Sequence, residues 1–147
     1  MKKKLISLCV AAALVIGVNA QEKVNDKDVP QSIQATFKSQ YPSASGAQWK
    51  MKDGKYKVHF QSDGTKQMAS FDQSGTLVSK GSLISESELP SAISSAVKSS
   101  YANRSINEVY KMDKNGSVNY VVKLNGSPET KVVYSEDGQV IKDKSDW

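Results

Sequence analysis

The sequence predicts an α+β fold built from two tandem helix-plus-antiparallel-strand repeats, with the helices packed on one face of a continuous or shared antiparallel sheet. Two observations support this prediction. The segment 29–41 returns, with the same spacing of apolar residues, as the segment 89–101. Each copy is followed by alternating apolar and polar residues that Asp-Gly or Asn-Gly pairs interrupt. A helix that cannot bury its apolar stripe alone needs such a shared sheet.

The N-terminus has the pattern of an export signal. Lysines at positions 2–4 precede an apolar run over residues 5–18, and Ala20 offers a small residue before a cleavage point. The run is shorter than the roughly 20 apolar residues needed to span a bilayer, which disfavours an uncleaved anchor. A lipidated Cys9 is the other alternative, but a lipidation site should close the apolar run. We therefore expect a cleaved signal peptide over 1–20, a periplasmic or secreted protein, and no membrane span.

Removal of this signal changes the composition of the protein. The net charge falls from +5 to +2 because three lysines leave with the signal, and the only cysteine leaves as well. The remaining chain has no disulfide framework and needs an ordinary hydrophobic core, for which its length is sufficient. Arg104 is the only arginine and the charges are interspersed, so the sequence gives little support for nucleic-acid binding.

The first repeat, over residues 29–82, begins with a helix. Residues 21–28 are polar and suit a flexible N-terminal segment. Ile33, Phe37 and Tyr41 are spaced four apart and share one helical face, and Pro42 ends the helix. Proline at position 30 is tolerated because the first helical turn has no partner for its N–H.

Four strands are predicted to follow the first helix. Trp49 and Met51 alternate with lysines in the first strand, and Asp53-Gly54 gives the hairpin turn to a second strand over 55–60. Asp63-Gly64 leads into a third strand over 65–71. After a turn over 72–75, residues 76–80 form a short fourth strand.

The second repeat, over residues 83–147, follows the same order. Ile93, Val97 and Tyr101 repeat the helical stripe, and Tyr110-Lys111-Met112 matches Trp49-Lys50-Met51. A longer turn over 113–116 replaces Asp53-Gly54, residues 120–124 match 56–60, and Asn125-Gly126 stands in place of Asp63-Gly64. Residues 134–141 match 71–78 at a constant offset of sixty-three. The insertions fall in turns, so we expect one compact domain.

An antiparallel sheet covered by helices on one side usually leaves its other face open to water. The alternation predicts that this open face carries basic residues, one histidine and several aliphatic residues: Lys50, Lys52, Lys57, His59, Val78, Val121, Lys123, Val133 and Ile141. Lysines around aliphatic residues would suit an acidic or mixed protein surface.

The order of turns and strands resembles a known family. Gly54-Lys-Tyr56-Lys-Val58, the turn Asp63-Gly64 and the segment 71–78 resemble the PepSY pattern of a glycine-led hairpin, a Tyr-x-Val strand, an Asp-Gly turn and a glycine-led final strand. The duplicated form behind a signal peptide resembles bacterial periplasmic PepSY-like proteins, whose fold is similar to that of the secreted β-lactamase inhibitory protein. The resemblance covers residues 29–144.

The resemblance implies a concave sheet that clasps a partner protein. Some members of the family are described as inhibitors and others as calcium-regulated. The inhibitor carries an acidic residue on a protruding hairpin loop, and Asp53 holds that position here. Because a two-residue turn is short for such a loop, Asp53 matches this feature only by position.

We therefore expect a non-catalytic protein that binds a partner protein through its open sheet face and hairpin turns. The predicted partner-binding residues are Asp53, Lys57, His59, Val121, Val133, Ile141 and Trp147. Trp147 has no counterpart in the other repeat, so it either caps the sheet edge or contacts the partner. The Asp-Gly and Asn-Gly pairs are what tight turns require irrespective of a ligand.

The alternative is a protein that responds to calcium or a small ligand. Asp113 and Asn115 resemble the start of a calcium loop, but the third side-chain ligand and the closing glutamate are absent. We expect no metal site and no cofactor. An enzyme is the least favoured class, because His59 is the only histidine and has no partner nucleophile or carboxylate in the sequence pattern.

Overall fold

The computed structural model describes residues 22–142, which form a single antiparallel sheet of nine strands with two α-helices. The strands lie in the sheet in chain order, so each one pairs with the next. The elements are β1 (Glu22–Val24), α1 (Gln31–Gln40), β2 (Ser45–Lys52), β3 (Lys55–Ser62), β4 (Thr65–Phe71), β5 (Leu77–Ile84), α2 (Ser91–Ser100), β6 (Ile106–Lys114), β7 (Ser117–Leu124), β8 (Thr130–Ser135) and β9 (Val140–Lys142). Short 3₁₀ turns, η1 (Asp26–Asp28) and η2 (Glu86–Glu88), precede the helices.

The two halves of the molecule follow the same order of elements. In the first half β1, η1 and α1 precede β2 to β4, and in the second half β5, η2 and α2 precede β6 to β8. Both helices begin directly after a proline whose carbonyl accepts the first helical N–H groups, and both end at a tyrosine. The α+β class and the continuous antiparallel sheet are therefore confirmed.

The segment before α1 differs from the flexible N-terminal segment that the sequence predicts for 21–28. Glu22, Lys23 and Val24 pair with Met51, Lys50 and Trp49 of β2, which makes β1 an edge strand. Val24 packs against the core under α1. The sequence did not predict this strand because its composition is polar, and only one of its three side chains contacts the core.

Three hairpins use two-residue turns in which both residues have positive φ. Asp53-Gly54, Asp63-Gly64 and Asn115-Gly116 all have this geometry, which is that of a type I′ turn. The first two turns are as predicted. The longer turn predicted over 113–116 is wrong, because Lys114 pairs with Ser117 and only Asn115-Gly116 lies between them. Asp113 and Lys114, which the sequence predicted to lie in the turn, extend β6 instead.

This longer strand changes which residues are equivalent. Trp49 pairs with Val58 in the core under α1, and Val109 pairs with Val122 in the corresponding core under α2. Tyr110, which the sequence matched to Trp49, pairs instead with Val121 on the opposite face of the sheet. The predicted equivalence of Tyr110 and Trp49 is therefore wrong by one residue, and one residue reverses the face of a strand.

Each helix covers a separate core on the same side of the sheet. The core under α1 contains Val29, Ile33, Phe37, Trp49, Val58, Phe60, Ala69 and Phe71. The core under α2 contains Leu89, Ile93, Val97, Val109, Tyr120, Val122, Leu124, Val132 and Tyr134. Across the sheet, Ala69 pairs with Lys80, Lys80 with Asp113, and Asp113 with Val118, and paired residues point to the same face. Ala69 belongs to the core region under α1 and Val118 to the core region under α2, so both helices lie on that face.

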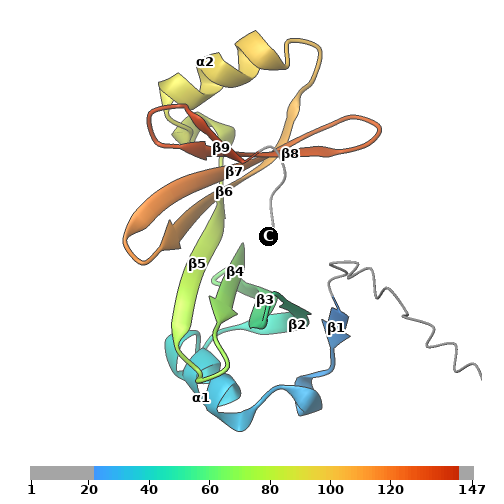
Figure 1. Cartoon of the computed structure of the whole chain (residues 1–147), viewed down its shortest axis with the longest axis vertical. Helices are drawn as coiled ribbons and strands as arrows, with labels where there is room; N and C mark the ends of the chain where they lie inside the picture. Colours follow the sequence, from blue (N-terminus) through green and yellow to red (C-terminus); the bar gives the residue numbers. More distant parts are fainter. Residues whose placement is uncertain (1–21, 143–147) are drawn as a thin grey trace, which may run out of the picture.

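The two helices lie at opposite ends of the molecule, and β5 runs between the halves (Figure 1). β5 is longer than the predicted strand over 76–80. Its beginning pairs with β4, and residues from Ser79 to Ile84 pair with β6. The side of the sheet that carries no helix faces inward between the halves, and we call it the concave face. No helix among residues 22–142 is long and apolar enough to cross a membrane.

Candidate functional site

The concave face contains residues from both halves that lie far apart in the sequence. Lys66 of β4 and Glu108 of β6 form an ion pair with 2.7 Å between Nζ and Oε1, although β5 lies between these strands in the sheet. Lys123 of β7 forms a second ion pair with Glu108, also at 2.7 Å. The long lysine and glutamate side chains span the width of β5. The Lys66–Glu108 pair therefore connects the two halves on the concave face.

An apolar cluster, which we call the seam, lies at the middle of the concave face. It consists of Met68 from β4, Tyr110 and Met112 from β6, Val121 from β7 and Val133 from β8. Gly81 of β5 makes this packing possible, because a Cβ there would lie 2.1 Å from the Met112 sulfur. The halves therefore contact each other on the concave face through side chains as well as through the backbone of β5.

The seam revises the role predicted for two aliphatic residues. Val121 and Val133 lie on the concave face as predicted, but their exposed fractions are only 2% and 5%. The residues packed around them leave them little surface for a partner. Ile141, in contrast, is 48% exposed and is available for contact.

Glu108 is the central acidic group of the concave face. Burial alone would raise the pKa of its carboxyl, but the hydrogen bonds and positive charges of Lys123 and Lys66 lower this pKa to about 2. The Tyr110 hydroxyl also donates to Glu108, at 3.2 Å, and burial beside this carboxylate raises the pKa of Tyr110 to about 12. Lys123 lies 5.3 Å from the centre of the Tyr110 ring. This network fixes the charge of Glu108.

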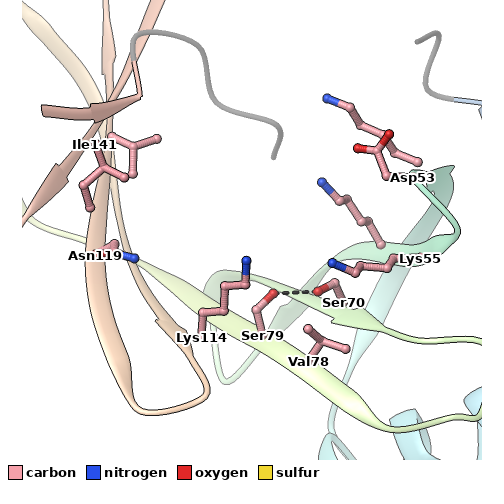
Figure 2. Close-up of a pocket in the computed structure, with 11 residues that line it drawn as sticks. Asp53, Lys55, Ser70, Val78, Ser79, Lys114, Asn119 and Ile141 are labelled. Carbon is pink, nitrogen blue, oxygen red and sulfur yellow. Dashed lines mark hydrogen bonds between the residues drawn. The ribbon is translucent and has the colours of Figure 1, made fainter. Parts of the chain in front are cut away.

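A groove of about 240 Å³ lies beside the seam, between the β2–β3 hairpin and the last strands of the second half (Figure 2). It is lined by Lys52, Asp53, Lys55, Lys57, Ser70, Val78, Ser79, Lys114, Asn119, Val133 and Ile141. Ser70 and Ser79 are buried and hydrogen-bonded to each other at 2.6 Å between their hydroxyl oxygens. They form a polar floor that is satisfied without a ligand.

The groove is basic. Among residues 22–142, four lysines line it and Asp53 is the one acidic residue of its lining. Lys55 and Lys114 come from different halves, and both are drawn beside the Ser70–Ser79 pair in Figure 2. Convergence of these charges from two walls favours an anionic ligand surface over a cationic one.

His59 pairs with Met68 on the concave face and is influenced by lysines from both halves. Burial lowers the pKa of His59 to about 4, with further contributions from Lys50, Lys123, Lys131 and Lys57. Two of these lysines belong to each half. His59 is therefore neutral at pH 7 and adds no positive charge to the face.

The structure brings together some of the predicted binding residues and separates others. Asp53, Lys57, Val133 and Ile141 line the groove. His59 lies elsewhere on the concave face, Val121 is buried in the seam, and Trp147 lies outside the described residues.

Sequence reasoning missed several residues that line the groove: Lys55, Ser70, Ser79, Lys114 and Asn119. Lys55 could have been found, because it lies two residues before Lys57 and shares its face. Lys114 could not, because its face depends on the extended register of β6.

Asp113 and Asn115, the weak candidates for a metal site, have structural roles in the β6–β7 hairpin. The carboxylate of Asp113 accepts a hydrogen bond from the Gly116 N–H at 2.8 Å, and Asn115 has the positive φ of the turn. Within residues 22–142 no group of three or more His, Cys, Asp or Glu residues is arranged to hold a metal ion. Calcium dependence stays a prediction that titration calorimetry with calcium and a chelator can check.

A family model described as "Putative beta-lactamase-inhibitor-like, PepSY-like" matches this chain twice, over residues 17–79 and 54–142. The two matches together cover most of the sequence. The chain belongs to this family. No protein with a curated function matches the sequence.

Solved structures resemble this PepSY-like protein over most of its length. A BLIP-like protein from Bacteroides fragilis has 26% sequence identity and a TM-score of 0.59, with 78% of this chain and 84% of that chain covered. A DUF2874 family protein from Bacteroides ovatus has 26% identity and a TM-score of 0.62, with 77% and 84% covered. A structure described as "putative periplasmic proteins" from Bacteroides eggerthii has 19% identity and a TM-score of 0.67, with 78% and 86% covered, and shows the fold alone.

Proposed function

We propose that this PepSY-like protein is a non-catalytic binding module that clasps an acidic or mixed surface of a partner protein in its concave face. The observation that supports the proposal is the groove, to which both halves contribute lysines around a few aliphatic side chains. A charged rim with an apolar contact at its centre is typical of protein interfaces. Ile141 is the exposed aliphatic residue of this surface.

The family supports the same conclusion. Its description as beta-lactamase-inhibitor-like points to a module that acts by contact with another protein rather than by catalysis. Polar groups of the concave face are paired with each other: Ser70 with Ser79 on the groove floor, and Glu108 with Lys66 and Lys123. This arrangement stabilises the surface that we propose binds the partner.

The proposal includes how the chain is organised and where it acts. We assign residues 1–20 to a cleaved signal peptide, and residues 29–82 and 83–147 to two PepSY-like repeats in one compact domain. The basic start and apolar run of the N-terminus support export to the periplasm or beyond. The repeated order of strand, 3₁₀ turn, helix and strands supports the duplication.

The experiment that tests this function is capture of a partner from a periplasmic extract with the immobilised chain 21–147. A groove variant, Lys55→Glu with Lys114→Glu, is compared with a matched control, Lys38→Glu with Lys98→Glu. The control changes the same charge on exposed positions of the two helices, on the other side of the sheet. Circular dichroism confirms that both variants fold.

We expect that one protein is captured by the wild type and by the control variant of the helices, but not by the groove variant. Mass spectrometry identifies it, and an excess of acidic residues on its contact surface is expected. Equal retention by the two variants would contradict the proposal, because the binding surface would then lie outside the groove.

A further inference from the structure

The two edges of the sheet differ in the side chains that they expose. β9 ends the sheet and, within residues 22–142, has no strand on its outer side. Val140 and Ile141 of β9 are 50% and 48% exposed and are the large hydrophobic residues that the described part of the chain leaves exposed. At the other edge, β1 exposes Glu22 and Lys23 and directs Val24 toward the core under α1.

Edge strands of soluble proteins are usually protected by charges, because their free N–H and C=O groups pair readily with other chains. β1 follows this pattern with a glutamate and a lysine. The two exposed aliphatic residues of β9 do not, and they favour the addition of another strand. This asymmetry indicates that β9 is the edge at which a partner pairs.

β9 also borders the groove. Ile141 lies on one side of the groove, and Asp53 and Lys55 of the β2–β3 hairpin lie on the opposite side (Figure 2). A segment that pairs with β9 therefore lies beside a basic wall. Its backbone would meet the open edge, and its side chains on the concave side would meet the lysines.

We infer that the partner contributes an extended acidic segment that binds as a tenth strand along β9, with acidic side chains at every second position directed to the groove lysines. This inference rests on the proposed function and specifies the form of the partner. Backbone hydrogen bonds give affinity in this mode of recognition, and alternate side chains give specificity. Period-two placement of the acids follows from the strand geometry.

Defined octapeptides test the inference with the full mature chain. The probe alternates Glu and Val over eight residues with both ends blocked, and the charge control replaces each Glu by Lys. Two further peptides carry backbone N-methyl groups, one on every Glu and the other on every Val. In a strand these two sets of N–H groups point to opposite edges, so each methylated peptide has one blocked edge and one free edge.

We expect the Glu-Val peptide to bind and the Lys-Val peptide to bind at least about tenfold more weakly, since the groove repels it. One methylated peptide should lose about tenfold or more in affinity and the other should bind like the parent, because only one edge pairs with β9. Nuclear magnetic resonance should show the largest amide shifts at residues 140–142.

Protein variants locate the site. Lys55→Glu should weaken the Glu-Val peptide about tenfold, and Ile141→Thr, which keeps a β-branched residue, should weaken it about threefold. Lys23→Thr on the opposite edge is the matched control and should leave binding unchanged. Circular dichroism confirms that each variant folds.

Equal effects of the two N-methylated peptides would overturn the inference, because binding would then depend on side chains alone. Failure of the Glu-Val peptide to bind, alongside a captured partner that depends on Lys55 and Lys114, would overturn the added strand and leave the proposed function standing. Binding that appears only after residues 143–147 are removed would also overturn it, because the chain's own end would then occupy the groove.

Discussion

The cores of the two halves use corresponding backbone positions but are filled with different side chains. The core under α1 is aromatic, and Phe37 makes edge-to-face contacts with Trp49 and Phe60 at ring-centre distances of 5.2 and 5.0 Å. At the corresponding positions under α2 the chain has Val97, Val109 and Leu124. The same arrangement of backbone elements therefore accommodates two different sets of core side chains.

The difference shows how the volume of a core can be redistributed. Ala69 in the first half corresponds to Val132 in the second, so a small residue lies near the large rings and a larger residue lies near the valines. Cores tolerate such exchanges when the total volume and the pattern of buried positions are kept. The four predictions below test the comparison, beginning with the largest expected effect.

Truncation at equivalent positions should cost more in the aromatic half. We expect Trp49→Ala to lower the free energy of unfolding by about 4 kcal/mol, and Val109→Ala by about 2 kcal/mol, because the first removes far more buried surface and leaves a larger cavity. Urea unfolding followed by circular dichroism measures both without depending on tryptophan fluorescence. Equal costs would show that the second core is as intolerant of cavities as the first.

The turns that rest on the two helices differ in how tightly they pack. Gly138 has a φ of 85°, and a Cβ there would lie 2.7 Å from the Ala92 carbonyl oxygen. Gly75 has a φ of 91°, and its Cβ would lie 3.3 Å from the Ser32 carbonyl carbon. Gly138→Ala should therefore cost about 3 kcal/mol and Gly75→Ala about 1.5 kcal/mol. Thermal unfolding should rank the variants in this order, and the reverse order would contradict the packing difference.

Glu108 forms one ion pair with Lys66 of the first half and another with Lys123 of its own half, and the contribution of these pairs to stability should depend on pH. The folded pKa of about 2 lies below the ordinary value of 4.5, so the stabilisation is present above pH 4.5 and is lost as the pH falls toward 2. We expect Glu108→Gln to cost about 1 kcal/mol at pH 7, since the pairs are partly exposed to solvent.

Denaturant unfolding at a series of pH values measures this loss. The difference between wild type and Glu108→Gln should shrink between pH 4.5 and 2, while the exposed loop substitution Glu129→Gln should have little effect throughout. A difference that does not depend on pH would indicate lost packing rather than lost charge.

The smallest expected effect is a gain in stability. Tyr134 corresponds to Phe71, is fully buried, and its hydroxyl has no hydrogen-bond partner among residues 22–142. Tyr134→Phe should therefore raise the free energy of unfolding by about 0.5 to 1 kcal/mol, because an unpaired buried hydroxyl is costly. Phe71→Tyr is the reciprocal change and should lower it. A loss of stability on Tyr134→Phe would show that the hydroxyl is satisfied, for instance by water.

The features that could be predicted from the sequence depend on local chemistry. Asp53-Gly54 and Asp63-Gly64 predict their turns because few residue pairs adopt positive φ at both positions. The helical stripe of Ile33 and Phe37 can be predicted from the period of the helix and from the residues at its two ends.

The features that could not be predicted depend on contacts between distant segments. The extension of β5 beyond the predicted strand begins with Gly81 and Ser82, which show no apolar alternation because their neighbours are supplied by β4 and β6. Val121 is buried in a cluster that includes Met68 from the other half, far away in the sequence. The groove was predicted only as an open face, because its walls meet through the curvature of the sheet.

The position of β5 has a consequence for how the protein unfolds. This strand pairs with the last strand of the first half, β4, and with β6 of the second half. The boundary between the two repeats, at residues 82 and 83, falls inside it. Neither half can melt while the other keeps all its backbone pairing. We therefore expect a single cooperative transition, in which the amide protons of β5 exchange with solvent only when the entire molecule opens.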